Sequence, residues 1–141
     1  LNEEERIELS CYRGITIKWL LEFTKQHNCW YMPTWMVRNK FILPATEQWH
    51  CRYVDIPELK NSTIIGKAST YVSHCWNSQW GVMVTAVCSG ADPNRRVWLD
   101  IFAVRQWPSN YIDVDYRGVI KKCSSFILCC SDFPGLKNLN E

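Results

Sequence analysis

The sequence predicts an α/β fold built on a parallel sheet of three strands. Residues 68–132 alternate in character, so that strand, helix, strand, helix and strand follow one another along the chain. Alternation at this length implies right-handed crossovers, which make neighbouring strands parallel. The second strand, over residues 96–104, is almost continuously apolar, as expected of a parallel strand that is covered on both faces.

The composition is that of a folded domain and argues against two classes of partner. The chain has 141 residues, of which 47% are hydrophobic and 21% charged, a balance typical of one globular domain. The net charge is +2, and the lysines and arginines are scattered rather than gathered in a basic stripe. The sequence therefore gives no indication of nucleic-acid binding. No apolar run approaches the roughly 18 residues of a membrane-spanning helix, and we expect no direct membrane insertion.

Residues 1–44 are predicted to form an N-terminal helical extension. The acidic start of the chain favours a helix N-terminus, because carboxylates there face the positive end of the helix dipole. Residues 15–28 repeat apolar side chains at helical spacing. A shorter helix is expected over residues 34–42, with Thr34 as its N-cap and Pro44 as its stop.

An irregular connecting loop is predicted over residues 45–67. Pro57 and Gly66 interrupt regular structure there, and residues 51–54 form a short extended piece. The α/β domain then occupies residues 68–141. It is expected to be only part of a larger domain, because the sequence contains just three recognisable strands.

Five elements make up this α/β domain in the sequence. Buried strands are expected over residues 68–73, 96–104 and 124–130. Helices are expected over residues 78–89 and 113–122. The first helix has an apolar content of helical length, although its many β-branched residues lower its intrinsic propensity.

Polar and aromatic residues gather where the first two strands end. An open α/β sheet binds its ligands beyond the carboxyl ends of its strands. The candidate ligand-binding residues at this edge are Ser73, His74, Trp76, Asp100, Gln106 and Trp107.

His74 and Asp100 form the most reactive pair in this set. A histidine that acts as a general acid or base needs a carboxylate or nucleophile in reach. Asp100 is the best candidate partner, because an acid within a strand is costly unless it is paired. Two plainer interpretations stay open, a His74 satisfied by local backbone and an Asp100 that caps the neighbouring loop. Ser73 is not a nucleophile for His74, since adjacent side chains on a strand point apart.

Eight cysteines and eight tryptophans stand out in the composition. No cysteine pair has C-x-x-C or zinc-finger spacing, so we expect no metal site. Free, mostly buried thiols in a reducing intracellular compartment such as the cytoplasm are the preferred interpretation, with disulfides as the alternative. The tryptophans either fill the core or form a contact surface, since tryptophan is enriched at interface hot spots.

Two short blocks resemble a known family. The block from Tyr71 to Trp76 reads Tyr-Val-Ser-His-Cys-Trp, the block from Val97 to Phe102 reads Val-Trp-Leu-Asp-Ile-Phe, and Gln106 follows. Together they resemble the TIR-like domains of algae and other protists. They are also similar to the fungal heterokaryon-incompatibility (HET) domain, which pairs a Ser-x-x-Trp strand end with a Trp-x-Asp strand and a downstream glutamine. The resemblance covers about residues 44–132.

This resemblance implies a flavodoxin-like fold in which the three strands take the order 2-1-3, so that the third strand has an exposed edge. It also implies signalling and self-association or binding of protein partners. The loop that carries Gln106 and Trp107 would correspond to a mobile segment in the family. Trp76 and Trp107 would then flank one groove and stack on a flat ring such as adenine or nicotinamide.

Some members of the TIR superfamily cleave NAD, and this chain departs from their pattern. Those enzymes use a glutamate in a Trp-Cys-x-x-Glu setting after the third strand, whereas this chain has only Glu141, behind Pro134 and Gly135. We therefore expect an interaction or assembly module within a larger protein, with no required cofactor and with NAD or a related nucleotide as an optional ligand. An NAD glycohydrolase with its catalytic glutamate beyond this chain and a purely structural accessory subunit stay open as alternatives.

Overall fold

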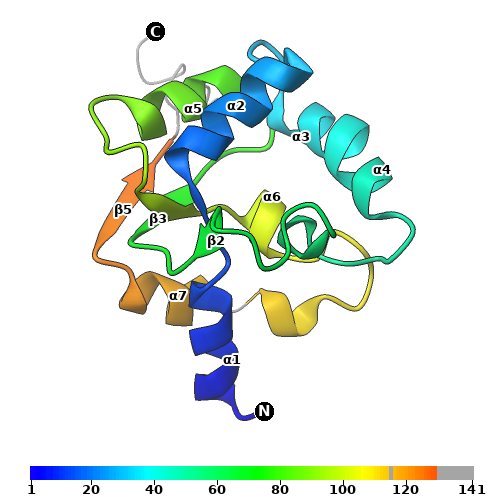
Figure 1. The fold of residues 1–141 in the computed structure, drawn as a ribbon, viewed down its shortest axis with the longest axis vertical. Coiled ribbons are helices and arrows are strands. Elements are labelled where there is room, and N and C mark those ends of the chain that lie inside the picture. Colours follow the sequence, from blue (N-terminus) through cyan, green and yellow to red (C-terminus); the bar gives the residue numbers. More distant parts are fainter. Residues whose placement is uncertain (115, 130–141) are drawn as a thin grey trace, which may run out of the picture.

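The computed structural model describes residues 1–114 and 116–129, which form a mixed α/β fold (Figure 1). Five strands form one sheet in the order β2-β1-β4-β3-β5. The strands are β1 (Gly14–Thr16), β2 (Ile65–Gly66), β3 (Thr70–Ser73), β4 (Arg96–Trp98) and β5 (Ser125–Leu128). β3 is parallel to both β4 and β5, whereas β1 is antiparallel to both β2 and β4. The sheet is therefore mixed, and it contains two strands that the sequence did not predict.

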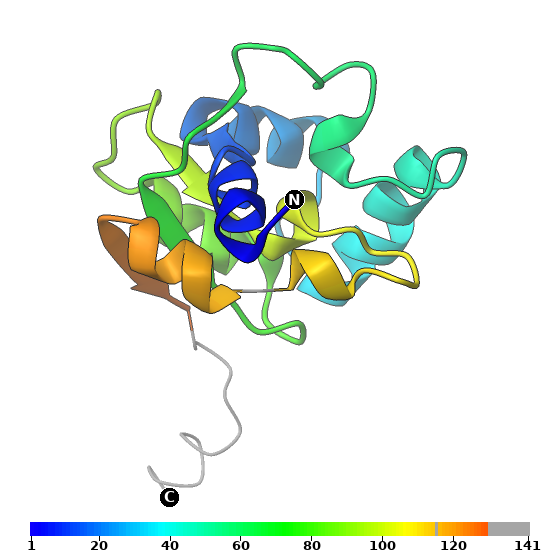
Figure 2. The same cartoon turned by 90° about the horizontal axis from the view of Figure 1, so that it is seen from below.

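Helices cover both faces of the sheet. α2 (Ile17–His27) and α5 (Trp80–Cys88) lie on one side, and α1 (Glu3–Cys11) and α7 (Tyr116–Lys122) lie on the other (Figure 1). Figure 2 shows α1 and α7 side by side. The acidic start does begin a helix, because the Asn2 side chain accepts a hydrogen bond from the Glu5 backbone N–H at 2.8 Å. The helices predicted over residues 78–89 and 113–122 are confirmed with shorter bounds.

The first unpredicted strand is β1, which occupies the expected start of the helix over residues 15–28. Thr16 is the N-cap of α2, and its hydroxyl accepts a hydrogen bond from the backbone N–H of Trp19 at 3.2 Å. β1 is only 3 residues long, and its apolar Ile15 fits the helical spacing equally well. Gly14 is needed here, because a Cβ atom would lie 2.9 Å from the Cβ of Ala68.

The strand predicted over residues 96–104 is wrong in its second half. β4 ends at Trp98, and the short helix α6 (Asp100–Ala103) follows. Ile101 and Phe102 are fully buried in that helix. A short apolar run does not distinguish a buried strand from a buried helix, which explains the error. Asp100 therefore stands in the first turn of a helix rather than within a strand, at the end where a negative charge is favourable.

The second helix does not stop before Pro44. α3 (Thr34–Val37) continues through the π-helix η1 (Arg38–Ile42) into α4 (Leu43–Thr46). Pro44 lies in the first turn of α4, directly after the π-helix. The expected N-cap is also wrong, because Pro33 holds that position and the Thr34 hydroxyl donates to the carbonyl of Ser78 at 3.0 Å.

Two short 3₁₀ helices complete the elements. η2 (Tyr53–Asp55) replaces the extended piece predicted over residues 51–54, and η3 (Tyr111–Asp113) precedes α7. Tyr53 and Val54 are buried, so the connecting loop is held on the core.

Two hydrophobic cores lie on opposite faces of the sheet. Neighbouring residues on β3 and β4 alternate between them, as the pleat of a strand requires. The larger core, beneath α2 and α5, includes Leu20, Phe23, Val72, Trp80, Met83, Val97 and Phe102. The smaller core, beneath α1 and α7, includes Cys11, Tyr71, Trp98 and Val119.

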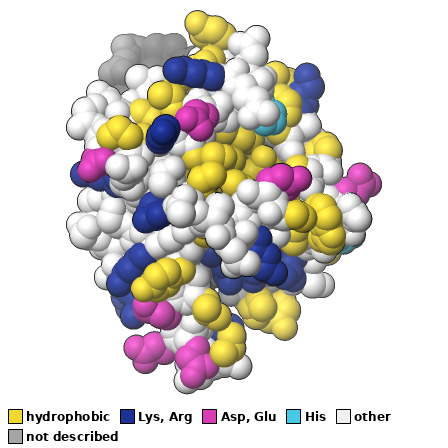
Figure 3. Space-filling model, in the orientation of Figure 1, with side chains coloured by type: hydrophobic (Ala, Val, Ile, Leu, Met, Phe, Trp, Pro, Cys, Tyr) yellow, Lys and Arg dark blue, Asp and Glu magenta, His cyan; other side chains and the backbone are white. Residues whose placement is uncertain are grey.

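The tryptophans that the structure describes divide between the core and the surface, and a contact surface formed by the exposed ones stays a prediction. Trp80 and Trp98 are fully buried, and each indole N–H donates a hydrogen bond at 2.9 Å, to the Thr24 hydroxyl and the Ser10 carbonyl respectively. Other indoles are exposed, as shown by the 49% exposure of Trp49 and the 37% exposure of Trp76. Figure 3 shows hydrophobic side chains on the surface of the face that carries α2.

The third predicted strand is not buried. β5 pairs with β3 through four residue pairs and stands at the end of the sheet that the described residues form. Phe126 is 49% exposed and Leu128 is 64% exposed, so apolar content here does not mark the interior. Within the described residues, no helix has both the length and the apolar character needed to cross a membrane.

Candidate functional site

The structure brings His74 and Asp100 together. His74 directly follows β3, and Asp100 begins α6 just after β4. Because β3 and β4 are parallel neighbours, their carboxyl ends lie at the same edge of the sheet. The Nε2 atom of His74 lies 2.6 Å from Oδ1 of Asp100, which is a short hydrogen bond.

The His74 imidazole has an unusual environment. Its side chain is only 3% exposed, and its Nδ1 atom is buried with no hydrogen-bond partner among the described residues. Since the carboxylate only accepts, Nε2–H is the donor, and the neutral ring then carries an unprotonated Nδ1. The indole of Trp76 packs edge-on against the ring, with centroids 5.1 Å apart.

This pair has the chemistry of a general base. Asp100 would stabilise an imidazolium, and Nδ1 is the atom that could take a proton or accept a hydrogen bond. Nδ1 is covered, however, so a ligand reaches it only if neighbouring side chains move. Consistent with this, neither His74 nor Asp100 lines any of five pockets that the described residues form.

Gln106 lies beside this pair and holds the backbone around α6. Its amide nitrogen donates to the carbonyls of Asp100 at 3.2 Å and Val104 at 3.0 Å. The guanidinium of Arg38 donates to the Gln106 side chain at 2.9 Å and to its carbonyl at 3.2 Å. Sequence reasoning missed Arg38, which comes from the π-helix η1 68 positions away.

Trp107 and Trp76 have different neighbours. The Trp107 indole donates to the Thr46 hydroxyl at 2.9 Å and stacks on His50, with centroids 4.1 Å apart and planes at 5°. No ring contact among the described residues joins Trp107 to Trp76. The groove between the two indoles stays a prediction.

Ser73 contributes a backbone contact at the end of β3. The Ser73 carbonyl accepts a hydrogen bond from the backbone N–H of Cys129 at 2.9 Å, which extends the pairing of β3 and β5. Glu141 lies outside the described residues, as does residue 130 of the predicted third strand.

A buried ionic cluster around Asp113 was not predicted. The Asp113 carboxylate accepts hydrogen bonds from the Arg52 guanidinium, at 2.9 Å from Nε, and from the backbone N–H of Arg105 at 3.0 Å. Arg13 lies 3.6 Å away. Burial alone would raise the pKa of Asp113, but the hydrogen bonds from Arg52 and Arg105 lower it below its ordinary value. The cluster links η2, η3 and the segment between α1 and β1, which indicates a structural role.

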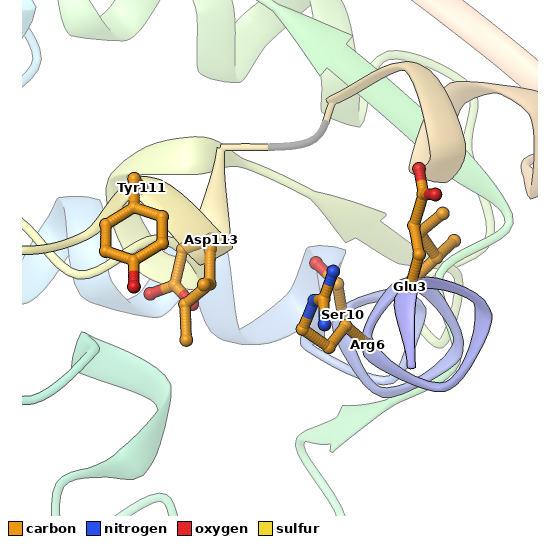
Figure 4. A pocket seen from close by; sticks show the side chains of 7 residues that line it. Glu3, Arg6, Ser10, Tyr111 and Asp113 are labelled. Atoms are coloured by element: carbon orange, nitrogen blue, oxygen red, sulfur yellow. The ribbon is translucent and has the colours of Figure 1, made fainter. Parts of the chain in front are cut away.

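One pocket borders this cluster. It has a volume of about 220 Å³ and lies between α1 and η3, as Figure 4 shows. α1 contributes Glu3, Arg6 and Ser10 to its wall, and η3 contributes Tyr111 and Asp113. The Ser10 hydroxyl is buried without a partner among the described residues.

The described cysteines are not grouped for metal binding. Cys11, Cys29, Cys51, Cys75, Cys88 and Cys123 are free thiols. Burial raises the pKa of Cys29 and of Cys123 to about 11, so both are protonated at neutral pH. No group of three or more His, Cys, Asp or Glu side chains suited to a metal ion occurs in the part of the chain that the structure describes.

Comparisons with protein-family models, with curated proteins and with solved structures found no match. The resemblance to TIR-like and HET domains therefore depends on the two sequence blocks and Gln106.

Proposed function

We propose that this chain is a TIR/HET-like association module that binds a protein partner, in the first instance a second copy of itself, along the edge of β5. The observation that carries the proposal is the exposure of Phe126 and Leu128 on a regular strand. An edge strand with exposed apolar side chains is a template for pairing with another strand.

The surface beside this edge is built from stacked rings. Phe126 stacks on Tyr71 with centroids 5.5 Å apart, and Tyr71 stacks on Trp98 with centroids 5.2 Å apart. The three rings form one row across β5, β3 and β4, anchored by the fully buried Trp98. A preorganised ring loses little conformational entropy on binding, which favours Phe126 as an anchor.

The flavodoxin-like fold belongs to the same proposal. β3 lies between β4 and β5 and is parallel to both, an arrangement that supports the order 2-1-3 for these strands. In this interpretation the antiparallel β1 and β2 extend the sheet on the other side. The free thiols support placing the protein in a reducing intracellular compartment.

Sedimentation of the purified chain tests this proposal. The wild type should self-associate with rising concentration, and Leu128→Lys should shift it to monomer, because a charge on the edge opposes strand pairing. Leu9→Lys is the matched control, since Leu9 is 50% exposed on α1. A wild type that stays monomeric, and that chemical cross-linking fails to join to another copy, would contradict the proposal.

A second candidate function is cleavage of NAD, which the His74–Asp100 pair favours. The pair lies at the carboxyl edge of the parallel strands, and its buried Nδ1 has no hydrogen-bond partner among the described residues, so movement of neighbouring side chains would expose it to a substrate. The catalytic glutamate would come from beyond this chain. Free nicotinamide released from NAD by the full-length protein, and lost in His74→Gln, would support this function. The absence of release would leave the association module or a purely structural accessory subunit.

A further inference from the structure

A pocket of about 470 Å³ lies between α2, α4 and the segment that follows η2. Its volume is within the range of small-molecule sites. Its floor is made of three rings from two elements, Trp19 and Phe23 from α2 and Tyr53 from η2. In Figure 3 hydrophobic side chains are visible on this face, with acidic side chains beside them.

The aromatic floor of the pocket is fixed by mutual ring contacts. The Trp19 ring lies 5.3 Å from that of Phe23 and 6.0 Å from that of Tyr53, measured between centroids. Phe23 and Tyr53 meet edge to face at 5.9 Å. Trp19 is half-buried, whereas Phe23 and Tyr53 are buried. The floor is therefore held in place by packing within the protein.

Trp49 forms an aromatic wall of the pocket that makes no ring contact with another described residue. It lines the pocket and is 49% exposed. None of the ring contacts among the described residues involves its indole, in contrast to Trp19 and Trp107. Its ring faces are available to a ligand.

The charge of the pocket is negative. Glu58 lines it and has no side-chain hydrogen bond or ion pair with the described residues. Burial and the nearby Glu58 carboxylate raise the pKa of Tyr53 to about 12. His27 also lines the pocket, but burial lowers its pKa, so the ring is neutral at pH 7. None of the described lining residues is a lysine or arginine.

We propose that this pocket binds a small organic cation with a trimethylammonium head, of which choline is the simplest example. Aromatic faces attract such a cation through the negative face of the ring, and they bind its methyl groups by hydrophobic contact. Glu58 supplies the opposite charge. The same surroundings disfavour a free phosphate or carboxylate, because Glu58 would repel it.

Titration of the full chain with choline chloride, followed by NMR of the tryptophan indole N–H groups, tests the proposal. Choline should perturb Trp49 and bind at least about fivefold more tightly than 3,3-dimethyl-1-butanol, its neutral isostere. Glu58→Gln should remove most of this difference. Glu47→Gln removes the same charge from an exposed residue outside the pocket and should leave it intact.

Two results would overturn the proposal. The first is equal binding of choline and its neutral isostere, which would make the pocket merely hydrophobic. The second is an unchanged preference in Glu58→Gln, with the fold of the variant verified by circular dichroism. A parallel titration with phosphocholine separates two sources of the same head group. Binding as tight as that of choline would indicate a lipid head group, whereas weaker binding would indicate a free solute.

Discussion

Asp113 in η3 and Arg52 directly before η2 form a buried ion pair, although the two residues are 61 positions apart in the sequence. The Asp113 side chain is only 2% exposed, and that of Arg52 is 15% exposed. This pair connects the loop before β2 to the segment before α7.

Asp113→Asn should lower the free energy of unfolding by about 3 kcal/mol, because it removes the buried carboxylate that pairs with both Arg52 and Arg13 and leaves Arg52 with only the more exposed Asp55. Urea denaturation measures this difference. Asp55→Asn is the matched control: Asp55 pairs with the same Arg52 but its side chain is 36% exposed, so its loss should cost less than about 1 kcal/mol. Equal effects of the two substitutions would contradict a special role for Asp113.

The pH dependence of stability should follow the Asp113 carboxyl. Its pKa in the folded state is lowered below the value in the unfolded chain. The stabilisation is therefore fully present above the unfolded pKa of about 3.9 and is lost as the pH falls through the folded pKa. Unfolding free energies measured by urea between pH 7 and acid pH should decline less steeply in Asp113→Asn than in the wild type. An unchanged slope would show that other carboxyls dominate.

The fold around β3 was predictable because its signals are local and regular. β3, α5 and α7 follow from strand-like and helix-like periodicities, and the parallel pairing of β3 and β4 follows from the connection between them. The contact of His74 with Asp100 was predictable for the same reason, since parallel strands bring their carboxyl ends to one edge.

What sequence reasoning missed is short or non-local. β1 has 3 residues and β2 has 2, too few for any periodicity to appear. The apolar run that contains α6 has the same composition whether it is strand or helix. The partners Arg38 and Arg52 were missed because no local pattern marks a lone arginine whose acceptor lies more than 60 positions away.

The tautomer of His74 is a further prediction. Long-range ¹⁵N NMR of the imidazole at neutral pH should show a proton on Nε2 and none on Nδ1, because Asp100 accepts from Nε2. Asp100→Asn keeps an acceptor and should preserve this tautomer, whereas Asp100→Ala should destabilise the protein by about 1–3 kcal/mol. A protonated Nδ1 in the wild type would contradict the assignment.

Gly81 should tolerate no side chain. A Cβ atom there would lie 2.5 Å from the backbone carbonyl oxygen of Trp30, which itself accepts a hydrogen bond from the Gly81 N–H at 2.8 Å. Gly81→Ala should therefore cost about 1–3 kcal/mol in thermal or urea unfolding. Gly66→Ala is the comparison, because the added atom would meet the far end of the long Arg96 side chain, which can move. A larger loss at Gly66 than at Gly81 would argue against this packing.

Hydrogen–deuterium exchange of the β5 amides as a function of protein concentration tests the association surface most directly. We predict that residues 125–128 exchange more slowly as the concentration rises, because a second strand would occupy the outer edge of β5, while α5 stays unchanged. Association without added protection of β5, or no association at all, would contradict the central claim that this edge binds a partner.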